Sequence, residues 1–401
     1  IMEKDIVFKS NRTVVEMSKK QQDDFYKNNK SYCPMAFKEV YADNNGRYRL
    51  CCHARVEPTT EKYKTQNTAP FEYFLSKEME AIRNKMMAGQ KIEACKTCYD
   101  LEDKGHQSYR NGKYKQKYGI DITPRNVGLK LRIHGSYCNL GCYMCFPYNS
   151  STRRNELTEV FGSPKEASTD FAQTYDPVKY KEWEKIMVDV EKHAHLISYM
   201  NFTGGEPLQL PNHWKMIDRI PEEHAKHIEL HYDTNLTDLR WKNHSIFDVN
   251  DKFKKVDLGV SCDHFGEKLD WIRYPIDRKQ FEANLEEANH IVKQLNCTVS
   301  LLNVYDLHEI YDYYYDKYGI KTTFHNVVRG PRFLSIKNLP EKNKLEIKRL
   351  YKGSIAVNTN YINAELDCEP HGDLDEFRNY CDKLSTNRNF DWRKIWHDIQ
   401  F

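Results

Sequence analysis

The chain has 401 residues, with 61 Lys and Arg against 58 Asp and Glu. This length allows two or three domains with a sizeable core, and a net charge of +3 gives no support for binding to nucleic acid or to an anionic membrane surface. The sequence contains no apolar run of about 18 residues, as a membrane span requires, and no signal-peptide core. We therefore expect a cytoplasmic protein that makes no membrane contact.

The twelve cysteines are unevenly distributed. In a cytosolic protein they act as metal ligands or free thiols more often than as disulfides. Five lie in the first quarter of the chain and three follow close together, whereas Cys262, Cys297, Cys368 and Cys381 are scattered singly. The two groups are the candidates for metal binding.

The first quarter of the chain predicts a hairpin and a helix. Residues 32–57 alternate and turn at Asn44-Asn45-Gly46, which is typical of a β-hairpin. Residues 70–90 carry apolar side chains at helical spacing and stop at Gly89. Cys95 and Cys98 follow this predicted helix directly.

From about Val127 strands alternate with helices. We expect strands over 127–135, 197–207, 227–235, 253–263, 297–305 and 321–328, and helices over 183–196, 213–221, 281–295 and 307–319. About six β-α units in series predict an α/β fold, with a parallel sheet and outer helices, open or closed into a partial barrel. The segment 331–401 is expected to be mostly helical.

Cys138, Cys142 and Cys145 are separated by three and then two residues, with no fourth cysteine nearby. A closed zinc site or a fully protein-ligated 4Fe–4S cube takes four ligands. Three thiolates leave one metal corner open, where a substrate or cofactor can bind.

Functional groups of parallel α/β barrels gather at the carboxyl ends of the strands. Here those ends carry the three cysteines, then Gly204-Gly205-Glu206-Pro207, then Asp233-Thr234-Asn235, and then Ser261 and Asp263. The glycine turn exposes backbone groups that can bind an amino group, Glu206 can pair with it, and the later hydroxyls and amides can bind a ribose. An amino-carboxylate head joined to a ribose is the chemistry of S-adenosylmethionine.

With these motifs the chain resembles the radical SAM superfamily over roughly 127–330. The cysteine spacing, the "GGEP" motif, "DTN" at 233–235 and "VSCD" at 260–263 carry the resemblance. It implies a partial (β/α)6 TIM-like barrel with a 4Fe–4S cluster on Cys138, Cys142 and Cys145. The implied cofactor-binding residues are Tyr143, Met144, Gly204, Gly205, Glu206, Pro207, Asn235, Ser261 and Asp263. Met144 departs from the family, which usually has an aromatic residue before the last cysteine.

The resemblance also implies a reaction. The reduced cluster passes one electron to S-adenosylmethionine, and cleavage gives methionine and a 5′-deoxyadenosyl radical that abstracts hydrogen from a substrate. A donor of flavodoxin or ferredoxin type is implied. We expect an enzyme, with the class (oxidoreductase, transferase or isomerase) left open, that acts on a peptide or protein side chain or α carbon. The alternatives are a small metabolite or nucleotide as substrate, and a non-enzymatic iron–sulfur electron-transfer protein.

The N-terminal cysteines resemble a second motif. Cys33, Gly46 and Cys51 match the opening signature of SPASM and twitch extensions, and "CKTCYDLEDKGHQSYR" at 95–110 is similar to a segment of phage-encoded twitch-type radical SAM proteins. This implies an auxiliary iron–sulfur cluster, a 4Fe–4S cube, on Cys33, Cys51, Cys95 and Cys98. Structural zinc is the alternative, and Cys52 can replace Cys51.

The expected domains follow from these assignments. They are a twitch-like auxiliary iron–sulfur region over 1–126, a radical SAM core over 127–330 and a C-terminal helical extension over 331–401. In most similar enzymes the auxiliary region follows the core, whereas here it precedes it.

Overall fold

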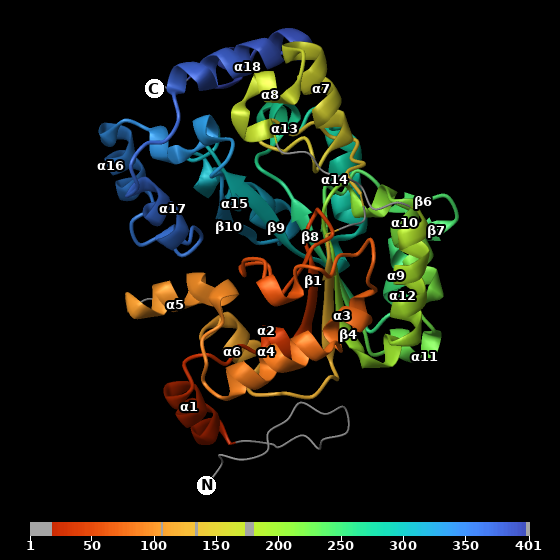
Figure 1. Ribbon diagram of the computed structural model, residues 1–401. Coiled ribbons are helices and arrows are strands. Elements are labelled where there is room, and N and C mark those ends of the chain that lie inside the picture. The colour runs from red at the N-terminus through yellow and green to blue at the C-terminus, as the bar shows by residue number, and fades with distance from the viewer. Residues whose placement is uncertain (1–17, 106, 133–134, 173–179, 398–401) are drawn as a thin grey trace.

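The computed structural model describes residues 18–105, 107–132, 135–172 and 180–397. Its centre is an eight-stranded sheet with the strand order β10-β9-β8-β5-β4-β3-β1-β2 (Figure 1). Six of these strands follow one another along the chain and pair in parallel: β3 (Val127–Leu131), β4 (Ile197–Phe202), β5 (Glu229–Thr234), β8 (Lys255–Ser261), β9 (Val292–Val299) and β10 (Thr322–Val327). The predicted α/β fold class with six β-α units is confirmed.

The helices between these strands lie outside the sheet (Figure 1), and several of them bury one apolar face. In α15 (Leu307–Tyr318) the buried residues are Leu307, Ile310 and Tyr314, which recur at helical spacing. The other connecting helices are α7 (Ser151–Phe161), α8 (Pro164–Ala167), α9 (Tyr180–Lys192), α10 (Pro211–Arg219), α11 (Glu222–Ala225), α12 (Ile246–Lys252), α13 (Gly266–Ile272) and α14 (Arg278–Glu287). A short hairpin, β6 (Arg240–Trp241) with β7 (His244–Ser245), precedes α12.

The boundaries around β9 differ most from the expectation. The helix expected over 281–295 ends at Glu287, and β9 starts at Val292, because 292–299 alternates between buried and less buried side chains. The strand expected to reach 305 ends at Val299, and a turn follows in which Asn303 Oδ1 accepts from the Ser300 backbone N–H at 2.8 Å.

The helix expected over 70–90 is two helices, α3 (Pro70–Phe74) and α4 (Lys77–Met87). Ser76 separates them because its side chain accepts from the Met79 backbone N–H at 3.3 Å and caps α4. The predicted end at Gly89 is confirmed, with a positive φ of 75° at that glycine.

The predicted N-terminal hairpin is confirmed and extends the sheet. It consists of β1 (Glu39–Ala42) and the antiparallel β2 (Tyr48–Arg49), joined by a turn over 43–47. Because β1 also pairs in parallel with β3, the hairpin turn lies at the carboxyl end of β3, the same end as the cysteine loop.

Short helices fill the rest of the chain. The N-terminal ones are α1 (Lys19–Asn28), α2 (Met35–Lys38), α5 (Lys96–Asp103) and α6 (Lys113–Tyr118), and the C-terminal ones are α16 (Glu341–Leu350), α17 (Thr359–Leu366), α18 (Leu374–Arg388) and α19 (Trp392–Ile395). The C-terminal segment is therefore mostly helical, as predicted. One continuous apolar core contains Phe37, Leu258 and Phe377, and so joins all three segments. Among the described helices, none has the length and apolar composition needed to cross a membrane.

Candidate functional site

Three cysteines lie on the loop between β3 and α7. Cys138 and Cys142 are buried and Cys145 is partly buried, and all three line one cavity of about 520 Å³. Residues at the carboxyl ends of the later strands line the same cavity. They include Gly204, Gly205 and Glu206 after β4, Asn235 after β5, Ser261 at the end of β8 and Thr298 on β9. The structure thus brings most of the predicted site residues together, in a volume that suits a small molecule.

The three thiols lie close enough to influence one another. Burial, and then the charge of Cys142, raises the pKa of Cys138. Burial and the same neighbour raise the pKa of Cys145 to about 12. Metal binding would offset the cost of ionising these buried thiols, because the positive charge of the metal stabilises a thiolate ligand.

The two glycines of the turn have different surroundings. Gly205 has a φ of +61°, and a Cβ there would lie 2.5 Å from the Tyr137 backbone oxygen. Gly204 has a φ of +93°, and a Cβ there would meet no atom within 4 Å. Gly205 therefore lets the turn approach the cysteine loop, whereas a Cβ at Gly204, which lines the cavity, would meet open space.

Glu206 is a buried carboxyl that joins two strand ends. Its Oε1 accepts from the Thr234 hydroxyl at 2.7 Å and from the Leu208 backbone N–H at 3.2 Å, and its Oε2 accepts from the Asn235 backbone N–H at 2.7 Å. Burial raises the pKa of Glu206 to about 7, against these hydrogen bonds, which lower it. Two oxygens offer about four acceptor positions, so a position remains on Oε2 for a further donor.

Asn235 connects β5 to the cysteine loop. Its Nδ2 donates to Asn139 Oδ1 at 2.9 Å and lies 3.7 Å from Cys138 Sγ. This amide is therefore placed beside a predicted cluster ligand. Ser261 lines the cavity from the next strand.

Asp263 lies behind the cysteine loop. It is fully buried, pairs with Arg273 at 2.7 Å and accepts from the Thr298 backbone N–H at 2.7 Å. Arg273 in turn donates from Nη1 to Cys142 Sγ at 3.8 Å. Asp263 does not itself line the cavity, and it reaches the site through Arg273 and Thr298, which do.

Three more predicted residues differ in their access to the cavity. Met144 lines it. Tyr143 is fully buried, with its hydroxyl on Ser300, and Pro207 begins a short buried turn. Of the three, only Met144 is among the lining residues described for this cavity.

The residues fit an iron–sulfur cluster with one open corner. Three thiols line the cavity, the lining residues described include no fourth cysteine, and the Gly204 side is open. Over the described ranges, no group of three or more His, Cys, Asp or Glu side chains is spaced for a single metal ion. A single zinc ion draws its sulfurs to about 2.3 Å from one point, whereas a cube holds each thiolate on a different iron.

Cys33, Cys51, Cys95 and Cys98 form a second group of buried thiols. Burial, and then the charge of Cys95, raises the pKa of Cys33. Burial and Cys33 raise the pKa of Cys51, and burial, Cys51 and Cys98 raise the pKa of Cys95. Because charges act strongly only over short distances, each thiol has another of the four as a near neighbour.

Cys52 differs from this group in its exposure. It is exposed, and its sulfur lies 3.7 Å from the Tyr114 hydroxyl, although its charge also raises the pKa of Cys51. Cys51 therefore shares the burial of the other three thiols, whereas Cys52 does not.

Residues 133–313 match the family described as the Radical SAM superfamily. The matched range includes the cysteine loop, the glycine turn and the ends of β5 and β8. Residues 133–313 are therefore similar to a radical SAM domain. Such a domain belongs to an enzyme, and no curated protein matches the chain closely enough to narrow its reaction.

Several solved structures are similar to the chain at low identity. Native anSMEcpe with bound AdoMet is 18% identical, with a TM-score of 0.40, and the match covers 56% of this chain and 59% of that one. Streptococcus suis SuiB bound to S-adenosylmethionine is 16% identical, with a TM-score of 0.38 and coverage of 69% and 56%. SuiB bound to its precursor peptide SuiA is 13% identical, with a TM-score of 0.37 and coverage of 85% and 60%. The chain thus spans less than two thirds of the length of each of these proteins.

A buried brace holds the cysteine loop of the radical SAM domain from the C-terminal side. Arg388, at the end of α18, donates to the Gly141 backbone oxygen at 2.8 Å and pairs with Glu156 of α7 at 2.7 Å. Glu156 also pairs with Arg153, which donates to the Tyr143 backbone oxygen at 3.0 Å. The carbonyls of the loop therefore depend on a helix more than 200 residues later in the chain.

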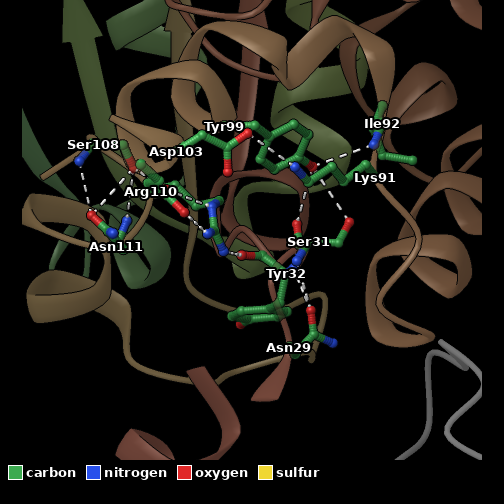
Figure 2. A network of polar contacts seen from close by, with 11 residues as sticks. Asn29, Ser31, Tyr32, Lys91, Ile92, Tyr99, Asp103, Ser108, Arg110 and Asn111 are labelled. Atoms are coloured by element: carbon green, nitrogen blue, oxygen red, sulfur yellow. Dashed lines mark hydrogen bonds and ion pairs between the residues drawn. The ribbon is translucent and has the colours of Figure 1, made fainter. Parts of the chain in front are cut away.

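A second polar network fixes the segment before Cys33 (Figure 2). Arg110 donates from Nη1 to the Tyr32 backbone oxygen at 2.8 Å and from Nε to Glu102 at 3.0 Å. The Ser108 hydroxyl also donates to Glu102. Glu102, Ser108 and Arg110 are the polar positions of the 95–110 motif, so in this chain they connect the helix that carries Cys98 to the residue next to Cys33.

Asn29 and Tyr99 complete this network (Figure 2). Asn29 Oδ1 accepts from the Ser31 and Tyr32 backbone N–H groups at 2.9 and 2.7 Å, and the Tyr99 hydroxyl accepts from the Ile92 backbone N–H at 3.3 Å. Each bond lies within a few residues of one of the four cysteines. The network therefore fixes the backbone next to the cysteines.

The sequence prediction missed Arg273 and Arg388. Each is a single arginine in a helical or loop segment without a local motif, and its contact with the cysteine loop appears only after folding. Asn235 and Glu206, in contrast, were recognisable because each belongs to a short motif at a strand end.

Proposed function

We propose that the chain binds a 4Fe–4S cluster on Cys138, Cys142 and Cys145 and cleaves S-adenosylmethionine reductively, so that the resulting 5′-deoxyadenosyl radical abstracts hydrogen from a substrate. The observation that carries this proposal is the single cavity that three thiols and an open glycine turn share. The bound cluster supplies the electron. The electron comes to it from a flavodoxin- or ferredoxin-type donor.

The residues of the chain position the cofactor in this proposal. Gly204 leaves room for the amino-carboxylate head, and Glu206 accepts from its ammonium group at the remaining position on Oε2. Asn235 and Ser261 face the ribose. The Asn235 amide and the Arg273 guanidinium lie beside cluster sulfurs, where donors and positive charge favour the reduced cluster.

Anaerobic reconstitution tests the proposal. With iron, sulfide, dithionite and S-adenosylmethionine, the wild-type protein is expected to release 5′-deoxyadenosine. Serine at any one of the three cysteines is expected to abolish this release, because a hydroxyl is a poor ligand for soft iron. Cys368→Ser, an exposed thiol in the C-terminal extension, is the control. Full activity in the triple Ala variant would refute the assignment.

Glu206→Gln gives a separate test of cofactor recognition. The variant is expected to bind S-adenosylmethionine more weakly while it keeps the cluster, as seen in iron content and in the electron paramagnetic resonance signal. Unchanged cofactor affinity would count against the proposed contact.

We propose that Cys33, Cys51, Cys95 and Cys98 hold an auxiliary 4Fe–4S cluster in a twitch-like region. Four buried thiols, each of which influences or is influenced by another of the four, support this proposal, since four ligands close a cube. Reconstituted protein is then expected to bind about eight iron per chain. About four iron with one zinc would identify this site as structural zinc. Cys52→Ser is the control that leaves the metal content unchanged.

For the substrate we propose a peptide or protein, modified at a side chain or α carbon. The resemblance of 33–51 and 95–110 to SPASM and twitch regions supports this class, since such enzymes often modify peptides. A small metabolite or nucleotide is the second candidate, since three arginines line a cavity where its carboxylate or phosphate could bind. Stimulation of 5′-deoxyadenosine release by a peptide fraction or by a nucleotide fraction separates the two classes.

A further inference from the structure

A second cavity of about 180 Å³ lies beside the cavity that the cysteines line. The hairpin turn between β1 and β2 forms much of its wall. Two observations connect the cavities: Arg132 lines both of them, and Asn44 of the small cavity donates to Asn149 Oδ1 of the large one at 2.9 Å. A ligand held in the small cavity therefore lies next to the predicted cofactor site.

The small cavity carries an excess of positive charge. Arg47, Arg49 and Arg132 line it, with Asp43 as the single carboxylate among its lining residues, which leaves two positive charges. Asp43 pairs with Arg47 and Arg49. Its Oδ2 accepts from Arg47 Nε at 3.0 Å and from Arg49 Nη2 at 2.7 Å. The Asp43 carboxylate therefore does not pair with Arg132.

The backbone of Arg132 is hydrogen-bonded, whereas its side chain keeps a donor without a partner. It follows β3 directly, and its backbone N–H donates to the Ala42 oxygen at 3.0 Å. Its Nε is buried and, within the described part of the chain, has no hydrogen-bond partner. Tyr41 and Tyr148 add two phenol groups to the same cavity. The Arg132 guanidinium already interacts with the Tyr41 hydroxyl, which opposes the rise that burial causes in the pKa of Tyr41. A guanidinium with an unpaired Nε beside phenol groups still matches the oxygens of a carboxylate or a phosphate.

We propose that the small cavity binds one oxyanion group of the substrate, a carboxylate or a phosphate, with Arg132 as the main donor. The anchored substrate then extends past Arg132 into the large cavity, where the reacting C–H bond meets the cofactor. The identity of the ligand as the substrate rests on the proposed function; the anion site itself does not.

Anion binding to the full-length protein tests this inference directly. The probes are AMP and N-acetylglutamate, titrated by calorimetry without reductant at constant ionic strength. Wild-type protein is expected to bind at least one of them saturably, and Arg132→Gln is expected to weaken that binding at least tenfold. Arg219→Gln is the control, because Arg219 is also partly buried and pairs with Glu184, away from both cavities. Tighter binding of AMP assigns a phosphate-bearing substrate, and tighter binding of N-acetylglutamate assigns a carboxylate.

Three results would overturn the inference: no saturable binding of either probe, an equal loss in both variants, or displacement of the probe by S-adenosylmethionine on reconstituted protein. The last would mean that Arg132 serves the cofactor carboxylate. If anion binding depends on Arg132 but no 5′-deoxyadenosine forms, the proposed function fails and the anion site stands.

Discussion

Glu206 and the glycines before it each contribute both to the folded backbone of the site and to the predicted cofactor contact. Glu206 joins the turn after β4 to the end of β5, while Gly205 allows the same turn to touch the cysteine loop. A substitution at either position therefore acts on the folded backbone as well as on the predicted cofactor contact.

Glu206 makes the stability of the metal-free protein depend on pH. Its pKa rises from 4.5 to about 7 on folding because of burial, so between these values the folded state holds a proton that the unfolded state has lost. The free energy of unfolding is then highest below pH 4.5 with respect to this group and falls as the pH rises to 7, by about 3 kcal/mol. Glu206→Gln is expected to remove this fall. Urea denaturation at a series of pH values checks it, and parallel pH curves for the two proteins would contradict the prediction.

Gly204 and Gly205 are expected to respond differently to alanine. Gly205→Ala forces a Cβ to within 2.5 Å of the Tyr137 oxygen, so the cysteine loop must move and iron binding should fall. Gly204→Ala meets no atom within 4 Å, so it should cost only the roughly 1–2 kcal/mol of its positive φ and leave the iron content unchanged. Its Cβ enters the cavity, so cofactor affinity should fall instead. Iron content and cofactor titration of the two variants give the comparison; equal iron loss in both would be inconsistent with it.

At the scale of elements, buried hydrogen bonds and an ion pair from α18 hold the cysteine loop and α7 in place. Arg388 is buried and donates to two backbone oxygens as well as to Glu156. Arg388→Met is expected to destabilise the protein by about 3–5 kcal/mol, because it breaks a buried pair and leaves carbonyls without donors. It should also lower the iron bound on reconstitution.

Arg378→Met on the same helix is the matched control for this variant. Arg378 is partly exposed and pairs with Asp375 at the helix surface, an interaction worth about 0–1 kcal/mol. The two variants are compared by thermal unfolding and by iron content. If both lose the same stability and the same iron, α18 does not brace the loop.

At the scale of the whole molecule, the predicted boundary at residue 126 lies inside one sheet. β1 pairs with β3 across it, and the apolar core includes residues from both sides. We predict that a chain truncated to 127–401 does not form a stable monomer, because removal of β1 exposes the edge of β3 and part of the core. Size-exclusion chromatography and a denaturation curve check this. A truncated monomer that unfolds cooperatively would show that 1–126 is a separate domain.

Patterns that repeat over a few residues were readable in the sequence. The cysteine spacing, the "GGEP" turn and the alternation of strands with helices each depend on local geometry, so they predicted the fold class and several residues that line the large cavity, including the three cysteines and Glu206. Local patterns predicted the ends of helices and strands less accurately. Ser76 divides a predicted helix because its hydroxyl caps the next helix. β9 begins inside another predicted helix because 292–299 alternates with period two.

Only the tertiary structure decided which distant residues meet. The pairing of β1 with β3 brings the arginines of the hairpin to Arg132, and the docking of α18 brings Arg388 to Gly141. It also buried Cys51 and left Cys52 exposed. These contacts join positions 50 to 250 residues apart or depend on which face of a strand is buried. Their energy comes from packing and desolvation of the whole chain, which no short stretch of sequence encodes.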